Sequence, residues 1–104
     1  MTKQDPIARF HKKTISYTYD NGWSFTNTFD GHTRVTEVPG RGVLNEQIEM
    51  TELRPDLYFA AWIDDEMGLI AQVIDLDNGT ILAAIPDENS STQILSGTLT
   101  DGGD

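Results

Sequence analysis

Four side chains of this chain have types and positions that could do chemistry together. Arg41 lies between two glycines, where its guanidinium is uncrowded and could clamp a carboxylate or a phenolate through its rigid fork of donors. Tyr17 and Tyr19 stand two residues apart, so in a strand both rings point to one face of the sheet. Asp64 stands two residues after Trp62, which places a carboxylate on an aromatic face.

Each of these groups also has an ordinary structural interpretation. An arginine between glycines is commonly an exposed loop residue, and the run Asp64-Asp65-Glu66 is typical of a solvated hairpin end. Strand tyrosines are commonly half-buried aromatics with a satisfied hydroxyl group. The chemical interpretation therefore depends on whether the fold brings the four side chains together.

Turn-forming residues recur at short intervals and divide the chain into short strands. The turns are expected at sites such as Asp20-Asn21-Gly22, Arg54-Pro55-Asp56 and Asp77-Asn78-Gly79, which supply preset or positive φ angles. Runs of β-branched and aromatic residues between the turns predict eight strands. These are Thr14–Tyr19, Trp23–Phe29, Thr33–Val38, Glu46–Leu53, Leu57–Ile63, Leu69–Leu76, Thr80–Ile85 and Gln93–Thr100.

The expected fold is a single all-β domain over residues 1–104, a small antiparallel up-and-down barrel of about eight strands. Asp5 followed by Pro6 predicts a short helical turn within the N-terminal segment 1–12, and residues 101–104 are expected to fray. Strand alternation puts Trp23 and Phe25 on one face, and Tyr58, Trp62 and Asp64 together on another. A face that mixes aromatic bulk with a carboxylate is typical of a barrel interior that holds a ligand, so Trp23, Phe25, Tyr58 and Trp62 are predicted to bind it.

Composition excludes several classes of function. Seven Lys+Arg against 17 Asp+Glu give a formal net charge of −10, which disfavours binding to nucleic acid or to an anionic membrane. The absence of cysteine fits a cytoplasmic protein, and the N-terminus lacks the apolar core of a signal peptide. His11 and His32 are isolated, so neither a metal nor another cofactor is expected.

The stretch Tyr17-Thr18-Tyr19-Asp20-Asn21-Gly22-Trp23 resembles the N-terminal signature of phenolic acid decarboxylases, which are cofactor-independent, lipocalin-like barrels of the calycin type. Asp30-Gly31-His32-Thr33, Gly40-Arg41 and Leu53 through Asp64 resemble further motifs of that family. The resemblance covers roughly residues 15–85. In length the chain is closer to the related MoaF-like group, whose members share the barrel.

The resemblance implies roles for the same four residues. Tyr17 and Tyr19 match the tyrosines that hold the substrate carboxylate, while Arg41 and Asp64 match an arginine and a glutamate at the other end of the pocket. Asp64 is one methylene shorter than that glutamate, and Gly42 replaces a tryptophan. A shorter acid can miss the atom it must serve, because catalytic positioning tolerates only about 1 Å.

Two functions remain open. The first is a cofactor-independent lyase or isomerase that acts on a small aromatic or conjugated carboxylic acid, with Tyr17, Tyr19, Arg41 and Asp64 as catalytic residues. The alternative is a non-catalytic, lipocalin-like binding protein of the MoaF-like type, in which the same residues set ligand specificity. A third possible function is a structural barrel that binds a protein partner, for which exposed apolar strand edges would be the evidence. A barrel of this size could also form a homodimer.

Overall fold

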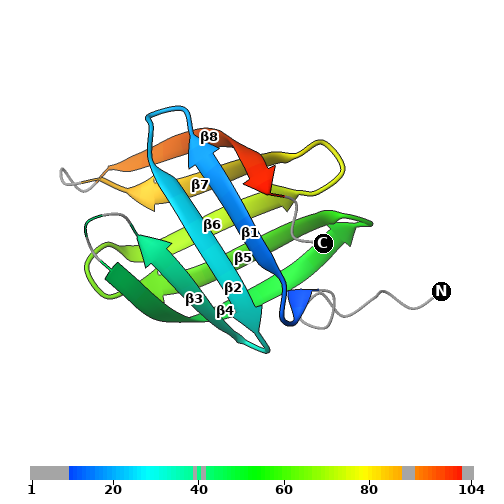
Figure 1. The fold of residues 1–104 in the computed structure, drawn as a ribbon. Coiled ribbons are helices and arrows are strands. Elements are labelled where there is room, and N and C mark those ends of the chain that lie inside the picture. Colours follow the sequence, from blue (N-terminus) through cyan, green and yellow to red (C-terminus); the bar gives the residue numbers. More distant parts are fainter. Residues whose placement is uncertain (1–9, 39, 41, 88–90, 102–104) are drawn as a thin grey trace.

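The computed structural model describes residues 10–38, 40, 42–87 and 91–101, and its described part contains the eight predicted strands. They are β1 (Thr14–Tyr19), β2 (Ser24–Asp30), β3 (Thr33–Val38), β4 (Gly42–Arg54), β5 (Leu57–Asp64), β6 (Gly68–Asp75), β7 (Thr80–Pro86) and β8 (Thr92–Asp101). Figure 1 shows these strands following one another around the sheet in chain order.

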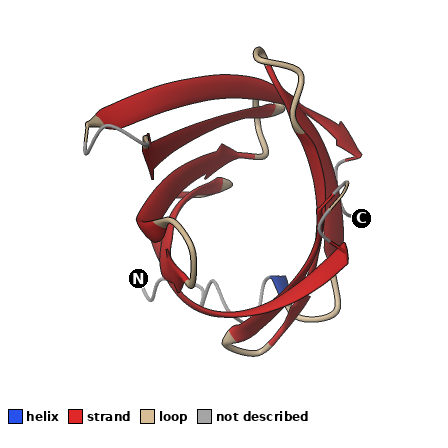
Figure 2. Ribbon diagram, turned by 90° about the vertical axis from the view of Figure 1, so that its left-hand side faces the viewer, coloured by secondary structure: helices blue, strands red, loops and turns tan. Residues whose placement is uncertain are grey.

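The eight strands form a closed antiparallel barrel. Each strand pairs with its neighbours in the sequence, and β1 pairs with β8 to close the ring. Figure 2 shows the strands curving around one central axis. Closure gives every strand a partner on each side, so this sheet has no edge strand. The predicted all-β barrel is thus confirmed.

Turn chemistry explains the position of most connections. Gly22 has a φ of 95° and Gly79 a φ of 68°, a region that side chains with a Cβ rarely adopt. Asp56, in the predicted turn after Pro55, also has a positive φ of 66°. Asp75 accepts hydrogen bonds from the backbone nitrogen and the side-chain amide of Asn78, which fixes the turn between β6 and β7.

One strand is longer than its residues predict. β4 begins at Gly42 rather than at Glu46, because its first half, 42–47, pairs with β3 while its second half, 48–54, pairs with β5. The first residues of β4 are mixed in polarity and carry no strand signal of their own. Pairing with β3 therefore sets where this strand begins.

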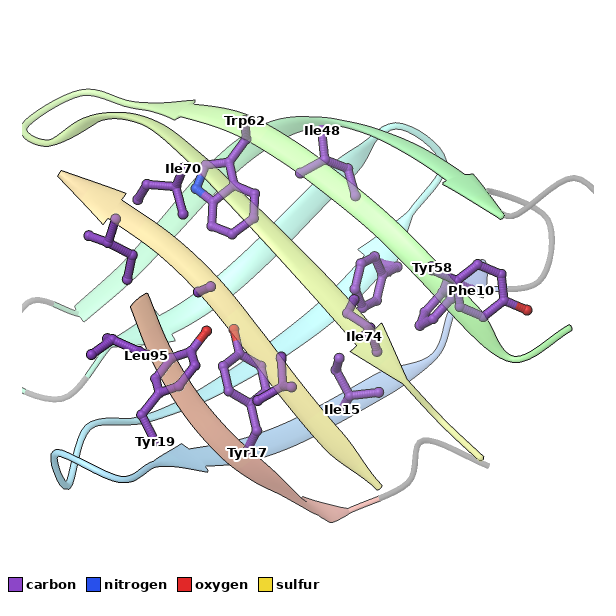
Figure 3. Packing of buried hydrophobic residues seen from close by; sticks show 14 residues of the cluster. Phe10, Ile15, Tyr17, Tyr19, Ile48, Tyr58, Trp62, Ile70, Ile74 and Leu95 are labelled. Carbon is purple, nitrogen blue, oxygen red and sulfur yellow. The ribbon is translucent and has the colours of Figure 1, made fainter. Parts of the chain in front are cut away.

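Phe10 closes one end of the barrel. Its ring centroid lies 4.9 Å from those of both Phe29 and Tyr58, and its side chain is 1% exposed. Hydrogen bonds of Lys12 and Lys13 with the backbone of Phe29 hold this segment against β2. Figure 3 shows Phe10 and Tyr58 together at one end of the buried cluster, with Tyr19 and Trp62 toward the other. The space for a ligand therefore has to lie toward the second end.

The chain ends agree with the expectations only in part. Phe10 is helical, while residues 5–9 of the predicted turn lie outside the described residues. Asp101, expected in a frayed tail, is the last residue of β8, because the pairing of β8 with β1 continues as far as Ser16 and Asp101. Residues 102–104 lie outside the described part of the chain.

Candidate functional site

A pocket of about 490 Å³ lies toward the end of the barrel opposite Phe10. Its walls are largely apolar and include the side chains of Trp23, Phe25, Trp62, Met67 and Ile70. The polar residues that line it are Tyr17, Tyr19, Ser24, Arg34, Thr36, Glu46, Asp64 and Gln72. This volume lies within the roughly 300–1,000 Å³ that small-molecule sites usually have.

Gln72 of β6 joins the two tyrosines of β1 to Arg34 of β3. Its Oε1 accepts a hydrogen bond from Arg34 Nη1 at 3.2 Å. Its Nε2 donates to the hydroxyl oxygens of Tyr17 at 3.2 Å and Tyr19 at 3.1 Å. Because a guanidinium has only donors, the amide oxygen of Gln72 must face Arg34 and the amide nitrogen must face the tyrosines.

A second path leads from Tyr17 to Glu46. The Tyr17 hydroxyl donates to Asn27 Oδ1 at 2.8 Å, Asn27 Nδ2 donates to Thr36 Oγ1 at 2.9 Å, and Thr36 donates to Glu46 Oε1 at 2.5 Å. Glu46 Oε1 also accepts from Nε and Nη2 of Arg34, at 2.9 and 2.7 Å. The bonds thus form a closed ring in which every proton points away from Arg34 and toward Glu46.

The ring leaves one phenolic proton free. Tyr17 donates its proton to Asn27, whereas the Tyr19 oxygen accepts from Gln72 and its proton has no acceptor among the described residues. Tyr19 lines the pocket. Its hydroxyl group can therefore donate a hydrogen bond to a bound molecule without breaking the ring.

Arg34 is held on three sides although its side chain is only 1% exposed. Its guanidinium carbon lies 3.8 Å from the ring centroid of Trp62, in addition to its bonds with Glu46 and Gln72. The Trp62 Nε1 atom is buried and has no hydrogen-bond partner among the described residues. Its hydrogen is thus a second donor beside the pocket that lacks an acceptor.

Asp64 also lines the pocket, at the end of β5. Its Oδ1 accepts hydrogen bonds from the backbone nitrogens of Glu66 at 2.9 Å and Met67 at 3.0 Å, which fixes the turn into β6. Among the described residues no basic side chain lies within ion-pair distance of it. The prediction that the run from Asp64 ends a hairpin holds, and this carboxylate also faces the pocket.

The predicted site residues fall into three groups. The structure brings Tyr17, Tyr19 and Asp64 to one pocket, together with the predicted ligand-binding residues Trp23, Phe25 and Trp62. Tyr58 does not line this pocket, because it lies against Phe10 at the closed end. Arg41 lies outside the described residues.

The sequence model of the MoaF-like family matches residues 11–100. The chain belongs to the MoaF-like family. A solved structure with the same fold is that of a proposed β-lactamase from Burkholderia vietnamiensis, which superposes with a TM-score of 0.79 at 21% identity, covering 96% of this chain and 99% of that one. At this identity the likeness extends to the fold alone. No curated protein matches the chain.

The described part of this MoaF-like chain has neither a cluster of metal-ligating side chains nor a membrane-spanning helix. Among the described residues, no three His, Asp or Glu side chains gather in a position to hold a metal ion. In the same part of the chain, no helix has the length and apolarity to cross a bilayer.

Sequence reasoning missed the buried polar ring of this MoaF-like barrel. Arg34 and Gln72 stand in predicted strands next to the apolar residues Val35 and Val73, and Glu46 stands between the polar residues Asn45 and Gln47, so nothing in the local pattern marks the three as buried. Asn27 could have been predicted to be buried, because it alternates with Phe25 and Phe29 on one face of its strand. A polar residue in the middle of an apolar strand face indicates a buried hydrogen-bond partner.

Burial raises the pKa of Tyr17 and of Tyr19 above the ordinary value of about 10, and for Tyr19 the neighbouring Tyr17 raises it further. Both phenols are therefore hydrogen-bond donors at neutral pH. Their contribution to stability is complete below pH ~10 and falls as pH rises further, because the unfolded chain then releases these protons first.

We expect Tyr19→Phe to flatten the alkaline loss of stability. Above pH ~10 each phenol that stays protonated in the folded protein should lower the free energy of unfolding by up to about 1.4 kcal/mol per pH unit. The variant lacks one of these phenols. Urea unfolding between pH 9 and 11 measures both slopes, and absorbance at 295 nm reports phenolate in the folded protein. Ionisation of all three tyrosines near pH 10 before unfolding would contradict the burial argument.

Proposed function

We propose that this MoaF-like protein binds a small aromatic molecule that carries a hydrogen-bond acceptor. The observation that carries the proposal is the Tyr19 proton, which a satisfied buried network leaves free at an apolar pocket. A network with fixed proton directions is a rigid and specific surface for a ligand. The buried Trp62 Nε1–H, which lacks an acceptor among the described residues, supports an acceptor on the ligand as well.

The charges of the pocket favour an uncharged ligand over an acid. The described lining has two carboxylates, Glu46 and Asp64, and one guanidinium, that of Arg34, which Glu46 already pairs. A carboxylate ligand would meet no unpaired positive charge among these residues. Its desolvation would then be poorly compensated.

The second candidate is the cofactor-independent lyase or isomerase acting on a small aromatic or conjugated acid. It is supported by Tyr17, Tyr19 and Asp64 lining one pocket, as the likeness to phenolic acid decarboxylases implies. In that chemistry the tyrosines would bind the acid, and Asp64 would transfer a proton. Arg41 would have to supply the positive charge.

A matched pair of probes separates the two functions. Quenching of tryptophan fluorescence is followed with p-coumaric acid and with its uncharged methyl ester, and loss of the cinnamate absorbance reports turnover. If the protein only binds its ligand, the ester should bind at least as tightly as the acid, and neither should be consumed. Consumption of the acid, abolished by Arg41→Gln, would instead establish the lyase.

Tyr19→Phe tests the proposed donor. The variant loses only one hydroxyl group, so we expect the affinity for the ester to fall about tenfold, the equivalent of a lost hydrogen bond of ~1.4 kcal/mol. Ser96→Ala, which removes a hydroxyl group from an exposed position on β8, is the matched control and should change nothing. Equal binding by all three proteins would contradict the role of Tyr19.

A further inference from the structure

The outer surface of β5, β6, β7 and β8 is apolar over nine positions. These residues, called the apolar face below, are Phe59, Ala61, Ile63, Leu69, Ala71, Val73, Leu82, Ala84 and Ile94. Strand pairing makes them neighbours, because Phe59 pairs with Val73 and Val73 with Leu82. In the next row Ala61 pairs with Ala71, Ala71 with Ala84 and Ala84 with Ile94.

The large side chains of the apolar face are well exposed. The exposed fractions are 40% for Phe59, 67% for Ile63, 61% for Leu69, 45% for Leu82 and 66% for Ile94. With about 200 Å² for each side chain, the five leave on the order of 500 Å² of apolar surface open. A patch of this size is at the upper end of what monomeric proteins show and marks an interaction surface.

The outer surface of β1 and β2, by contrast, is polar. The outer positions of β1 and β2 are threonines and serines that bond across the strand pair, Thr14 with Thr28, Ser16 with Thr26 and Thr18 with Ser24. Their oxygen atoms lie 2.8–3.1 Å apart. The outer surface of the sheet therefore has one region of paired hydroxyl groups and one apolar face, and the nine side chains of the apolar face have no group that binds water.

The charges around the apolar face favour a second copy of this chain over an anionic membrane as its partner. None of its nine residues is charged, whereas Glu49 borders it on β4 through its pairing with Ala61, and Asp75 ends β6. These acids and the net charge of −10 oppose binding to an anionic membrane. Two copies of this chain repel one another less where both present uncharged surface than where both present acids.

We propose that the apolar face is the interface of a homodimer, in which it packs against the same face of a second copy. A two-fold axis requires only that the patch complement itself, and a pleated sheet surface of alanine and branched side chains can interdigitate with its own copy. The exposed apolar area, together with a polar rim, approaches the ~800 Å² that each partner buries in a standard interface.

The dimer is tested by sedimentation equilibrium of the full chain between about 1 and 100 µM. We expect a dimer, and we expect its dissociation constant to fall as salt rises, because salt screens the repulsion between two acidic copies. A wild-type monomer at every concentration would overturn the proposal and would leave the face to a partner of another sequence. A dimer weakened by salt would also overturn it, since the contact would then be ionic.

Matched charge substitutions locate the interface. Ile63→Glu places an acid inside the apolar face and should raise the dissociation constant at least 100-fold. Val43→Glu introduces the same charge at a valine on β4 that is 61% exposed and lies outside the face, and it should leave the dimer unchanged. If both variants dissociate equally, or neither does, the interface lies elsewhere. Circular dichroism confirms that each variant is folded, and the face lies outside the pocket, so ligand binding is a separate measurement.

Discussion

Replacing Glu46 with glutamine is expected to cost about 3–5 kcal/mol of the free energy of unfolding. The glutamate Oε1 accepts three hydrogen bonds, two from Arg34 and one from Thr36, and the variant leaves the guanidinium without a negative partner. Arg34 is 1% exposed and cannot turn to water. A loss of this size is a large part of the ~5–15 kcal/mol that stabilises a typical domain.

Urea unfolding followed by circular dichroism measures this loss. Glu49→Gln is the matched control, because Glu49 stands on the same strand but its side chain is 87% exposed. It should change stability by no more than about 0.5 kcal/mol. An equally small change in Glu46→Gln would mean that Arg34 does not depend on the glutamate.

The double variant Arg34→Met/Glu46→Leu separates the cost of a broken pair from the value of the pair itself. Removing both charges leaves no unpaired ion, so most of the stability lost in Glu46→Gln should return. Some loss should remain, because Gln72 Oε1 then lacks its donor. Recovery of folding without recovery of ligand binding would indicate that the ion pair serves the site more than the fold.

The eight strands could be predicted because their signals are local. A turn such as Asp77-Asn78-Gly79 needs a positive φ that glycine supplies, and the runs of residues between turns have the side chains that strands favour. The start of β4 at Gly42 could not be predicted in this way, because it depends on pairing with β3. Local chemistry thus sets the turns, and pairing sets how far a strand extends.

The candidate site was only partly predictable for a different reason. Tyr17 and Tyr19 were found through their two-residue spacing and through the family resemblance, and the structure places both on the pocket. Arg34 was missed because it points inward while Val35 points outward, which inverts the usual pattern. A buried arginine is favourable only with partners on other strands, here Glu46 and Gln72, and such partners become visible only after closure.

Tyr58 shows the opposite error. Its alternation with Trp62 correctly places both side chains inside the barrel, but alternation gives no position along the barrel axis. Tyr58 lies four residues from Trp62, which is about 13 Å along a strand at ~3.3 Å per residue. That distance separates the closed end, where Tyr58 meets Phe10, from the pocket.

Gly97→Ala is expected to disrupt the closure of the barrel between β1 and β8. A Cβ at this position would lie 2.5 Å from the backbone oxygen of Thr18, 3.0 Å from Cα of Tyr19 and 3.1 Å from Cγ2 of Ile81. The first two atoms belong to the β1 backbone, which cannot retreat without lengthening the hydrogen bonds of the β1–β8 ladder. We expect a loss of about 3 kcal/mol, the upper range for overpacking.

The same substitution should also affect the site. Gly97 pairs directly with Tyr19, so a shift of β1 moves the phenol away from Gln72 and from the pocket. Urea unfolding measures the stability, and quenching by the methyl ester of p-coumaric acid measures binding at a urea concentration where the variant is still folded. Ser96→Ala, at the adjacent outward-facing position, should leave both unchanged. Wild-type stability of Gly97→Ala would contradict this prediction. It would mean that the space between β1 and β8 accepts a Cβ, although that atom would lie 2.5 Å from the backbone oxygen of Thr18.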